Sequence, residues 1–296
     1  MTVLALEVGA AGFAAGQVDD DIGSDAIRRI PLPDSEPWEG CRDLLLEVAA
    51  GTEVTALGIA CAGPIDMAAG VVASVEIPQW RTGFAIAEAA RKLFPTAAVS
   101  MALDGVCLAL AERSFGGAQD AMDSLAISLS DHIAGGVTVG GFAVVGRTGN
   151  AGSIAHMLVP GFDEPCECGG RGCVEAVASG AAIRRWARGQ GWSGDSLSAL
   201  LASAREGDDI ALAALGRAGT TLGKAISSAA ALLDIDLVIV GGSMASAGPA
   251  LWKPLGEAVA GSSRPGYLAG LRVLPSQLGD LGVLAGAGVL ALLASK

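Results

Sequence analysis

The chain has 296 residues, of which 51% are hydrophobic and 4% aromatic, so it can bury a mostly aliphatic core in one large domain or two ordinary ones. Its formal net charge of -12 argues against a nucleic-acid-binding surface, because such a surface needs a basic patch. The densest basic group, Arg184, Arg185 and Arg188, is short, and we interpret it as the solvated face of a helix.

The N-terminal residues predict strands alternating with helices. Aliphatic runs at residues 2–6 and 13–18 predict two strands joined by a glycine turn. Polar residues and two prolines predict a loop over 21–36. Apolar residues at helical spacing predict a helix over 38–50, and a buried strand follows over 54–61.

The same alternation continues to the C-terminus and is typical of an α/β fold. In chain order, the predicted elements are a helix over 84–93, a strand over 97–101, a helix over 106–115, a strand over 124–129, a hairpin over 137–145, helices over 174–187, 196–205 and 209–233, a strand over 236–240, a helix over 245–260, a strand over 270–274 and a terminal helix over 282–293.

Three cysteines cluster after one of the two histidines. Cys166, Cys168 and Cys173 lie within eight positions, and His156 precedes the first of them by ten residues. Thiolate and imidazole are the ligands that tetrahedral zinc prefers, and four of them close a structural site. The glycines between Cys168 and Cys173 let the backbone turn tightly. We therefore expect one structural zinc ion; the alternative is free buried cysteines beside a core histidine.

This motif, H-x9-C-x-C-G-x2-G-C-x-E, resembles the zinc signature of the ROK family, a group of repressors, open reading frames and sugar kinases. Further family motifs recur in order along nearly the whole chain. The resemblance implies an α/β fold of two ribonuclease-H-like domains, as in actin-like ATPases and sugar kinases, flanking a cleft. It divides the chain into a small N-terminal domain, 1–113 plus 281–296, and a larger domain, 114–280, that carries the zinc motif.

Three segments resemble the nucleotide-binding parts of the family. Residues 7–12, EVGAAG, stand where the family has D-x-G-G-T-K, so Glu7 and Gly9 remain while the second glycine, the hydroxyl and the cation are absent. Backbone N–H groups in such a turn can point at a phosphate, although a plain hairpin is the alternative reading. The strand before Gly241 and Gly242 resembles the adenosine-binding segment.

Residues 130–136, SDHIAGG, stand where the family has its second phosphate loop, G-T-G-x-G-G-G, so Gly135 and Gly136 remain. Asp131 adds a negative charge, and His132 adds a ring where only glycine allows close approach. Two unit charges about 4 Å apart repel by roughly 4 kcal/mol at an effective dielectric of about 20. That repulsion would lower nucleotide affinity about a thousandfold. Alternatively, His132 simply pairs with Asp131.

The resemblance also implies catalytic and sugar-binding positions. Asp104 matches the family's general base, which would accept the proton of a sugar hydroxyl as it attacks the γ-phosphate. A helix N-cap is the other interpretation of Asp104, and the two are compatible. Glu76, His156 and Glu175 match further sugar contacts, with Glu76 in place of an Asn. Two other contacts are lost, because Leu103 replaces an Asn and Ser153 replaces a Glu.

The apolar runs and the cysteines indicate in which cellular compartment the chain is expected. The first apolar run contains Glu7 and no basic n-region, so we expect no signal peptide. The longest uncharged apolar run, 281–295, is too short for a membrane helix, so we expect no membrane association. Scattered cysteines at 41, 61 and 107 fit a reducing compartment, and we expect a cytoplasmic protein.

Two functions are compatible with these features. The altered phosphate loops favour a hexose-binding kinase homologue with weak or lost ATP-dependent phosphotransfer. The alternative is an active hexose kinase of the glucokinase or N-acetylhexosamine kinase class, which would use Mg-ATP. The first predicted strand begins at residue 2, so we expect no preceding helix-turn-helix domain of the kind found in family repressors, and no DNA binding. Family members often form dimers, and we expect a homodimer.

Overall fold

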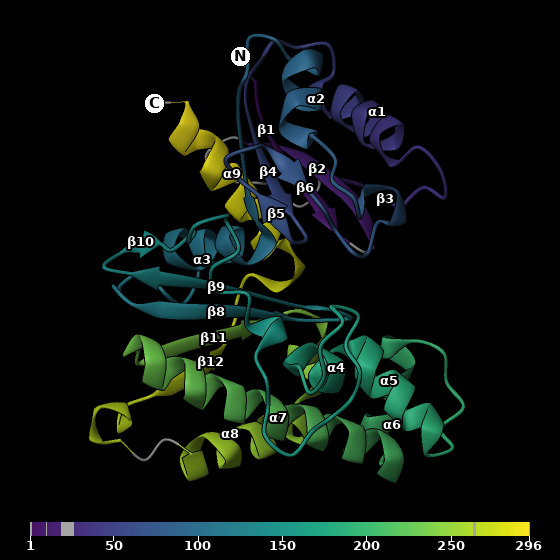
Figure 1. Cartoon of the computed structure of the whole chain (residues 1–296), viewed down its shortest axis with the longest axis vertical. Coiled ribbons are helices and arrows are strands. Elements are labelled where there is room, and N and C mark those ends of the chain that lie inside the picture. The colour runs from purple at the N-terminus through teal and green to yellow at the C-terminus, as the bar shows by residue number, and fades with distance from the viewer. Residues whose placement is uncertain (1, 10, 19–26, 263–264, 296) are drawn as a thin grey trace. The chain divides into compact units, whose positions relative to one another are not determined.

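The computed structural model describes residues 2–9, 11–18, 27–262 and 265–295. Residue 10 of the expected first turn and residues 21–26 of the expected loop lie outside the described residues. The chain forms two compact units, which Figure 1 shows from the purple N-terminus to the yellow C-terminus. The first comprises Met1–Gln119, Gly136–Gly152 and Leu281–Lys296, and the second comprises Asp120–Gly135 and Ser153–Asp280. The domain limits expected from the sequence remain a proposal.

The first unit is built on a five-stranded mixed sheet in the order β3-β2-β1-β4-β7. β1 pairs antiparallel with β2 and parallel with β4, and β4 pairs parallel with β7. β4 is buried almost throughout, as expected for a parallel strand covered on both faces. The strands are β1 (Thr2–Gly9), β2 (Gly12–Val18), β3 (Arg28–Ile30), β4 (Val54–Cys61) and β7 (Ala98–Leu103), with a separate small hairpin of β5 (Ile65–Asp66) and β6 (Val71–Val72).

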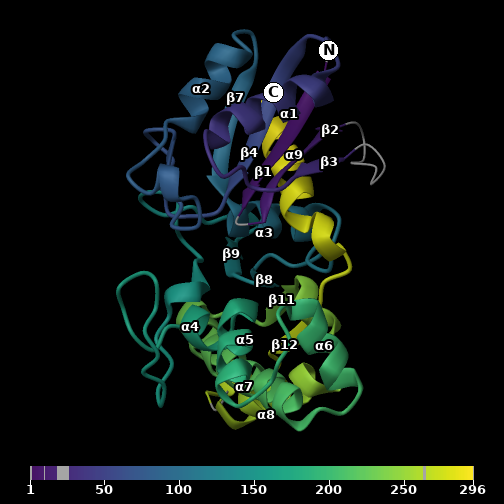
Figure 2. The same cartoon turned by 90° about the vertical axis from the view of Figure 1, so that its right-hand side faces the viewer.

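In the described part of this unit, four α-helices pack around the sheet. The C-terminal helix α9 packs against β1, β4 and β7 and against α3, and Figures 1 and 2 both show it running beside β1 and β4. Its residues Leu284 and Ala287 belong to the same apolar core as Leu4 and Leu57 of the strands. The helices are α1 (Pro37–Ala49), α2 (Ile86–Leu93), α3 (Asp104–Ser114) and α9 (Gly282–Ala294), and a short 3-10 helix spans Pro78–Trp80.

The second sheet has the order β10-β9-β8-β11-β12. β8 pairs parallel with β11, and β11 pairs parallel with β12. β9 begins in the second unit and ends in the first, where β10 pairs with it as a hairpin. The strands are β8 (Ser124–Leu129), β9 (Ile133–Val139), β10 (Phe142–Ala143), β11 (Leu237–Gly241) and β12 (Arg272–Pro275).

The helices of the second unit gather around α7, a 25-residue helix that packs against α4, α5, α6 and α8. Asp208 caps its start by accepting the amide of Ala211 at 2.8 Å. The helices are α4 (Val174–Ala178), α5 (Gly180–Gly189), α6 (Leu197–Arg205), α7 (Asp209–Leu233) and α8 (Pro249–Ser262), with short 3-10 helices at Ile154–His156, Ser243–Ala247, Gly266–Leu268 and Gly279–Leu281. The expected α/β class is confirmed.

Three expected elements were wrong in detail. Residues 28–30 form β3 inside the expected loop, because they pair with Phe13 to Ala15 of β2. The helix expected over 174–187 is two helices, since Ser179 has an extended backbone and its Oγ accepts the Ala182 amide at 3.1 Å, which starts a new helix. The helix expected over 245–260 begins only at Pro249, after a 3-10 turn and Gly248, whose φ is 64°.

Candidate functional site

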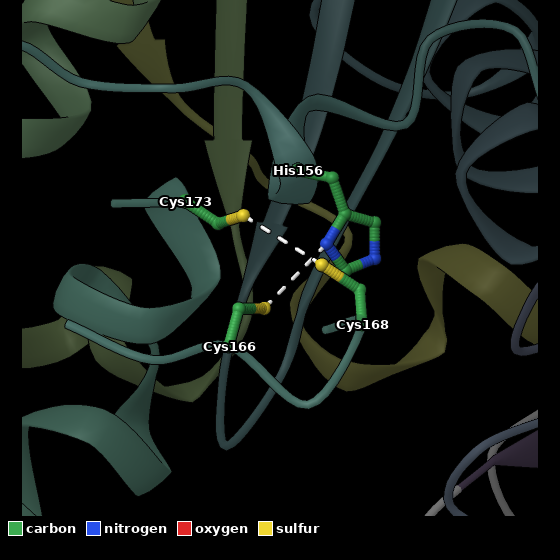
Figure 3. Close-up of side chains that lie close together, drawn as sticks. All are labelled: His156, Cys166, Cys168 and Cys173. Atoms are coloured by element: carbon green, nitrogen blue, oxygen red, sulfur yellow. Dashed lines mark hydrogen bonds between the residues drawn. The ribbon is translucent and has the colours of Figure 1, made fainter. Parts of the chain in front are cut away.

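Four side chains of the second unit converge as the sequence predicted. The ring nitrogen and sulfur atoms of His156, Cys166, Cys168 and Cys173 all lie within 4.8 Å of one another, and Figure 3 shows them pointing inward. Cys168 Sγ is 3.8 Å from Cys173 Sγ, and His156 Nδ1 is 3.8 Å from Cys166 Sγ. Zinc–sulfur bonds of about 2.3 Å in a tetrahedron place sulfurs about 3.8 Å apart, so the donor set and spacing fit a metal ion.

Backbone turns bring the ligands together. The Cys166 amide donates to the Gly170 carbonyl at 2.9 Å, and the Gly169 amide donates back to the Cys166 carbonyl at 3.0 Å. Gly169 has a φ of 87°, which side chains rarely adopt. Gly172 has a φ of 72°, and a β-carbon there would lie 2.6 Å from the Phe162 carbonyl oxygen. Gly169 is therefore required for its backbone conformation, and Gly172 is required for both conformation and space.

The three thiols of this cluster differ in their tendency to ionise. Burial raises the pKa of the Cys173 thiol to about 12 and also raises that of Cys166. The pKa of Cys168 is lowered, chiefly because the Gly170 amide donates a hydrogen bond to its sulfur. Cys168 is therefore the thiol that ionises most readily.

The other three cysteines lie in the core of the first unit and form no disulfide. Burial raises the pKa of Cys41 to about 12 and also raises the pKa values of Cys61 and Cys107. These thiols are 0% exposed, so they act as core residues.

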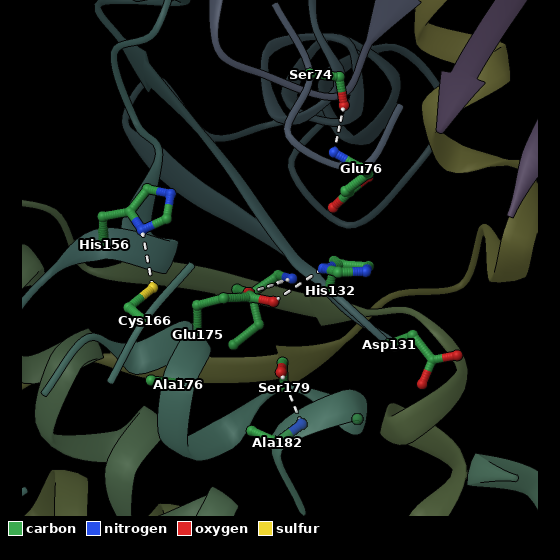
Figure 4. Close-up of polar contacts among 12 residues, drawn as sticks. Ser74, Glu76, Asp131, His132, His156, Cys166, Glu175, Ala176, Ser179 and Ala182 are labelled. Atoms are coloured by element: carbon green, nitrogen blue, oxygen red, sulfur yellow. Dashed lines mark hydrogen bonds and ion pairs between the residues drawn. The ribbon is translucent and has the colours of Figure 1, made fainter. Parts of the chain in front are cut away.

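The loop that resembles a second phosphate loop is held by two side-chain pairs. His132 Nδ1 lies 3.0 Å from Glu175 Oε1, and the Ile133 amide donates to Glu175 Oε2 at 2.9 Å (Figure 4). Arg184 Nη2 donates to Asp131 Oδ1 at 2.7 Å. His132 is thus paired with Glu175, and Asp131 is paired with Arg184.

The start of helix α5 also holds this loop. The amides of Gly180 and Ala181 donate to the carbonyl oxygens of Ser130 and Asp131 at 2.7 and 3.1 Å. A β-carbon on Gly180 would lie 2.8 Å from the Ser130 oxygen, so this close approach requires glycine. The first amides of the helix are thus satisfied by the loop backbone.

Of the arginines of α5, Arg185 and Arg188 are exposed, as expected for a solvated helix face, whereas Arg184 is only partly exposed. The Arg184 side chain is 23% exposed and, besides pairing with Asp131, donates to the carbonyl oxygens of Gly180 and Asp195. Arg188 also donates to the Asp195 carbonyl, at 2.9 Å. The helical spacing of Arg184 and Arg188 was visible in the sequence, but their partners lie in loops whose approach it does not specify.

In the first unit, Asp104 is the first residue of α3, directly after β7. The N-cap position belongs to Leu103, and Asp104 Oδ1 accepts the adjacent Gly105 amide at 2.6 Å. The N-cap interpretation is therefore wrong by one position. A carboxylate in the first turn still suits the positive end of the helix dipole.

Glu7 and Gly9 lie on β1, where Glu7 faces Ala14 of β2 and Gly9 pairs with Gly12 at the end of the hairpin. Gly136, also in the first unit, packs against α3: a β-carbon there would lie 1.8 Å from the Gly105 carbonyl oxygen. Helix packing alone therefore requires glycine at 136.

Glu76 lies in a segment that aromatic stacking holds in place. Its amide donates to Ser74 Oγ at 3.3 Å (Figure 4). Trp80, four residues on, is stacked between Phe13 and Phe84, with ring centroids 5.8 and 4.6 Å away. These rings fix the backbone that carries Glu76.

Gly135, Gly241 and Gly242 belong to the second unit. Gly242 has a φ of 83°, and a β-carbon on it would lie 2.6 Å from the Leu129 carbonyl oxygen. The glycine turn after β11 is therefore required by its approach to β8.

One group of contacts was not anticipated from the sequence. The Arg217 guanidinium carbon lies 5.1 Å from the ring centroid of Phe162 and 5.7 Å from that of Trp186, and Arg217 pairs with Glu164. This cluster fastens the metal-ligand loop to α7. Phe162 and Glu164 lie 55 and 53 positions before Arg217, so local patterns gave no signal.

Over the described residues, every helix is too short or too polar to cross a bilayer.

The sequence profile of the ROK family matches residues 3–294. The chain is 30% identical to the glucokinase of Thermotoga maritima, over 98% of this chain and 97% of that protein. It is 33% identical to the kanosamine kinase of Amycolatopsis mediterranei, over 81% of this chain and 78% of that protein.

Solved structures agree with these matches. The ROK family glucokinase of Streptomyces griseus, in complex with glucose and AMPPNP, superposes with a TM-score of 0.85 at 26% identity, covering 99% of this chain and 100% of that one. The ROK hexokinase of Thermus thermophilus gives 0.81 at 28% identity and covers 100% of both chains. The chain belongs to the ROK family, with the α/β fold of its sugar kinases, which is that of the actin-like ATPases.

Proposed function

We propose that this chain binds a hexose-type sugar and has weak or no ATP-dependent phosphotransferase activity. The proposal of weak or absent phosphotransfer is supported by the side-chain pairing within the loop over residues 130–133. Its Asp131 is paired with Arg184, and its His132 is paired with Glu175. The family's loop offers glycines and a hydroxyl at these positions, whereas this loop is filled by side chains that pair within the protein.

The proposal of sugar binding is supported by the relatives. They include glucokinases and N-acetylmannosamine kinases, and the Streptomyces griseus structure contains glucose. We assign the ligand contacts to Glu76, Asp104, His156 and Glu175, whose carboxylates and imidazole suit sugar hydroxyls. The remaining nucleotide contacts would be Glu7, Gly9, Gly135, Gly136, Gly241 and Gly242.

The Asp131–Arg184 pair changes the expected cost of the negative charge. An isolated carboxylate would repel a phosphate by roughly 4 kcal/mol at about 4 Å. Arg184 offsets part of that repulsion. The main obstacle to phosphate binding is therefore steric, because the His132 ring and the Asp131 carboxylate take space that a glycine loop leaves open. Both effects act against phosphate binding.

An active hexose kinase is the second candidate. Asp104 favours it, because a carboxylate at the start of α3 could accept the proton of a sugar hydroxyl while that oxygen attacks the γ-phosphate of Mg-ATP. The 30% identity to a glucokinase over nearly the whole chain also favours it.

We propose that the metal centre holds zinc. His156, Cys166, Cys168 and Cys173 would be its four ligands and leave no open position, which is typical of a structural ion. When bound, such an ion supplies stability rather than reaction chemistry. The His156 ring has a second nitrogen, and we assign the sugar contact to it.

Two measurements test the function. Thermal shifts are recorded with Mg-ATP alone and with glucose, N-acetylmannosamine and kanosamine, and a coupled assay follows phosphotransfer to each sugar. We expect a sugar shift, no nucleotide shift, and turnover far below the roughly 10 per second common among enzymes. Asp104→Asn is the control, since any genuine turnover should fall in it. Turnover near 10 per second that Asp104→Asn abolishes would establish the second candidate instead.

We further propose a homodimer in a reducing, cytoplasmic compartment, with a small sugar as partner and neither nucleic acid nor membrane. The six free cysteines support the compartment, and the family supports the dimer. Light scattering tests the assembly: a mass near 29.3 kDa, that of one chain, would contradict a dimer.

A further inference from the structure

Glu175 uses both carboxylate oxygens on one loop. Oε1 lies 3.0 Å from His132 Nδ1, and Oε2 accepts the Ile133 amide at 2.9 Å (Figure 4). The Glu175 side chain is 17% exposed, so water competes little for these bonds. A carboxylate in its ionised form only accepts hydrogen bonds, so its pairing with His132 then requires the hydrogen on Nδ1.

The position of Glu175 is set by the metal-ligand segment. Cys173, a proposed ligand, is the N-cap residue of α4, and Glu175 is in the first turn of that helix. The Val174 amide donates to the Met157 carbonyl at 2.9 Å, beside His156. Cys173 is two residues before Glu175 at the start of α4, and the Val174–Met157 bond joins this start to the residue after His156, so the order of these two ligands bears directly on Glu175.

The first half of the loop has different anchors. Its Ser130 and Asp131 carbonyls accept amides of α5, and the Asp131 carboxylate accepts from Arg184. Glu175 holds the second half of the loop through His132 and Ile133. The loop's order thus depends on two neighbouring helices, one of which begins at a metal ligand.

We propose that Glu175 is a positioning residue: acting through His132 and Ile133, it transmits the order of the metal-ligand segment 156–175 to the loop 130–133. This rests on the proposed metal site and ligand loop, and it adds to Glu175 a role beyond the sugar contact assigned above. A residue that only touched sugar would leave the ligand-free loop unchanged when replaced.

The first test uses the full chain without sugar and compares Glu175→Ala and Glu175→Gln with Asp163→Asn. Asp163 lies in the same segment, but its carboxylate is exposed and pairs with Arg171. Amide hydrogen exchange at Ile133 should become at least about tenfold faster in Glu175→Ala and stay unchanged in Asp163→Asn. Unchanged exchange in Glu175→Ala would overturn the proposal.

Nitrogen-15 spectra of the imidazoles give a second readout that does not depend on stability. His132→Gln identifies the His132 signals among those of the two histidines. The native ring should carry hydrogen on Nδ1. In Glu175→Gln the amide NH2 faces Nδ1 if its oxygen keeps the Ile133 bond, so the Nε2–H tautomer should appear. Identical His132 spectra in native and Glu175→Gln protein would contradict the pairing.

A third experiment measures the zinc content of the protein before and after chelation and repeats the measurement of amide hydrogen exchange at Ile133. Removing zinc should accelerate exchange at Ile133 in the native chain and add little in Glu175→Ala, because the link is already cut. Fully additive effects would show that metal and Glu175 act independently and would overturn the coupling. If the native chain binds no zinc, the proposed metal site fails, while the variants still decide whether Glu175 holds the loop.

Discussion

Gly286 of α9 lies so close to Cys107 of α3 that a β-carbon added at Gly286 would stand 1.7 Å from the Cys107 carbonyl oxygen. The same holds between Gly58 of β4 and α9, where an added β-carbon would be 1.9 Å from the Ala287 carbonyl oxygen. Backbone therefore meets backbone on two sides of the terminal helix. Because α3 begins at Asp104, the C-terminal residues also support the proposed catalytic position.

Gly286→Ala should destabilise the protein by about 2–3 kcal/mol, because the methyl group forces the two helices apart. The measurement is the free energy of unfolding in urea. Gly256→Ala in α8 is the matched control: no atom lies within 4 Å of its added β-carbon, so helix propensity should make it neutral or stabilising by up to about 1 kcal/mol. Equal effects of the two substitutions would refute the close packing.

Features that depend on residues close together in the sequence were predicted correctly. The helix over 209–233 was anticipated to its last residue, since its apolar period is long and Asp208 precedes it. The four proposed metal ligands also come together as expected, because their chemistry and their glycines lie within one short segment.

Pairings between distant residues could not be predicted in this way. His132 meets Glu175 across 43 positions, and Asp131 meets Arg184 across 53. Their approach depends on how α4 and α5 follow the metal-ligand loop, and in particular on the break at Ser179. Apolar periodicity continues through that break, so the sequence pattern favoured one helix and gave Arg184 the wrong surroundings.

Replacing Asp131 by Thr and His132 by Gly together should restore a thermal shift with Mg-ATP. The change removes the carboxylate and the ring from the loop and releases Arg184, whose charge then attracts phosphate. Asp163→Asn, which alters an exposed carboxylate elsewhere, should show no such gain. A double variant that still responds to sugar but not to Mg-ATP would instead place the defect in residues 7–12.

Arg217→Ala should destabilise the second unit by about 2–3 kcal/mol. Its side chain is 16% exposed, lies against the rings of Phe162 and Trp186, and pairs with Glu164, so its loss removes stacking and leaves a partly buried carboxylate. Arg217→Lys should recover part of the loss, because lysine keeps the charge but not the planar stacking.

Arg171→Ala is the control for Arg217, since it pairs with Asp163 in the same loop but both side chains are more than half exposed. It should cost less than about 1 kcal/mol. Zinc release to a chromogenic chelator should be faster in Arg217→Ala than in Arg171→Ala. Equal release rates would mean that contact with α7 does not hold the metal-ligand loop.

Zinc should protect Cys168 from alkylation. In the metal-free protein Cys168 is exposed and its pKa is lowered by the Gly170 amide, so it should react first with iodoacetamide, and its rate should level off at a lower pH than that of an ordinary cysteine. Cys41, Cys61 and Cys107 are 0% exposed and should react only on unfolding.

Peptide mass spectrometry measures the alkylation of each cysteine with and without added zinc. In Cys168→Ser, the peptide that contains position 168 should no longer be labelled at that position, and the protein should no longer bind the metal. Equal labelling of Cys168 in the presence and absence of zinc would contradict a four-ligand centre, because coordination to zinc lowers the nucleophilicity of a thiolate and should slow its alkylation.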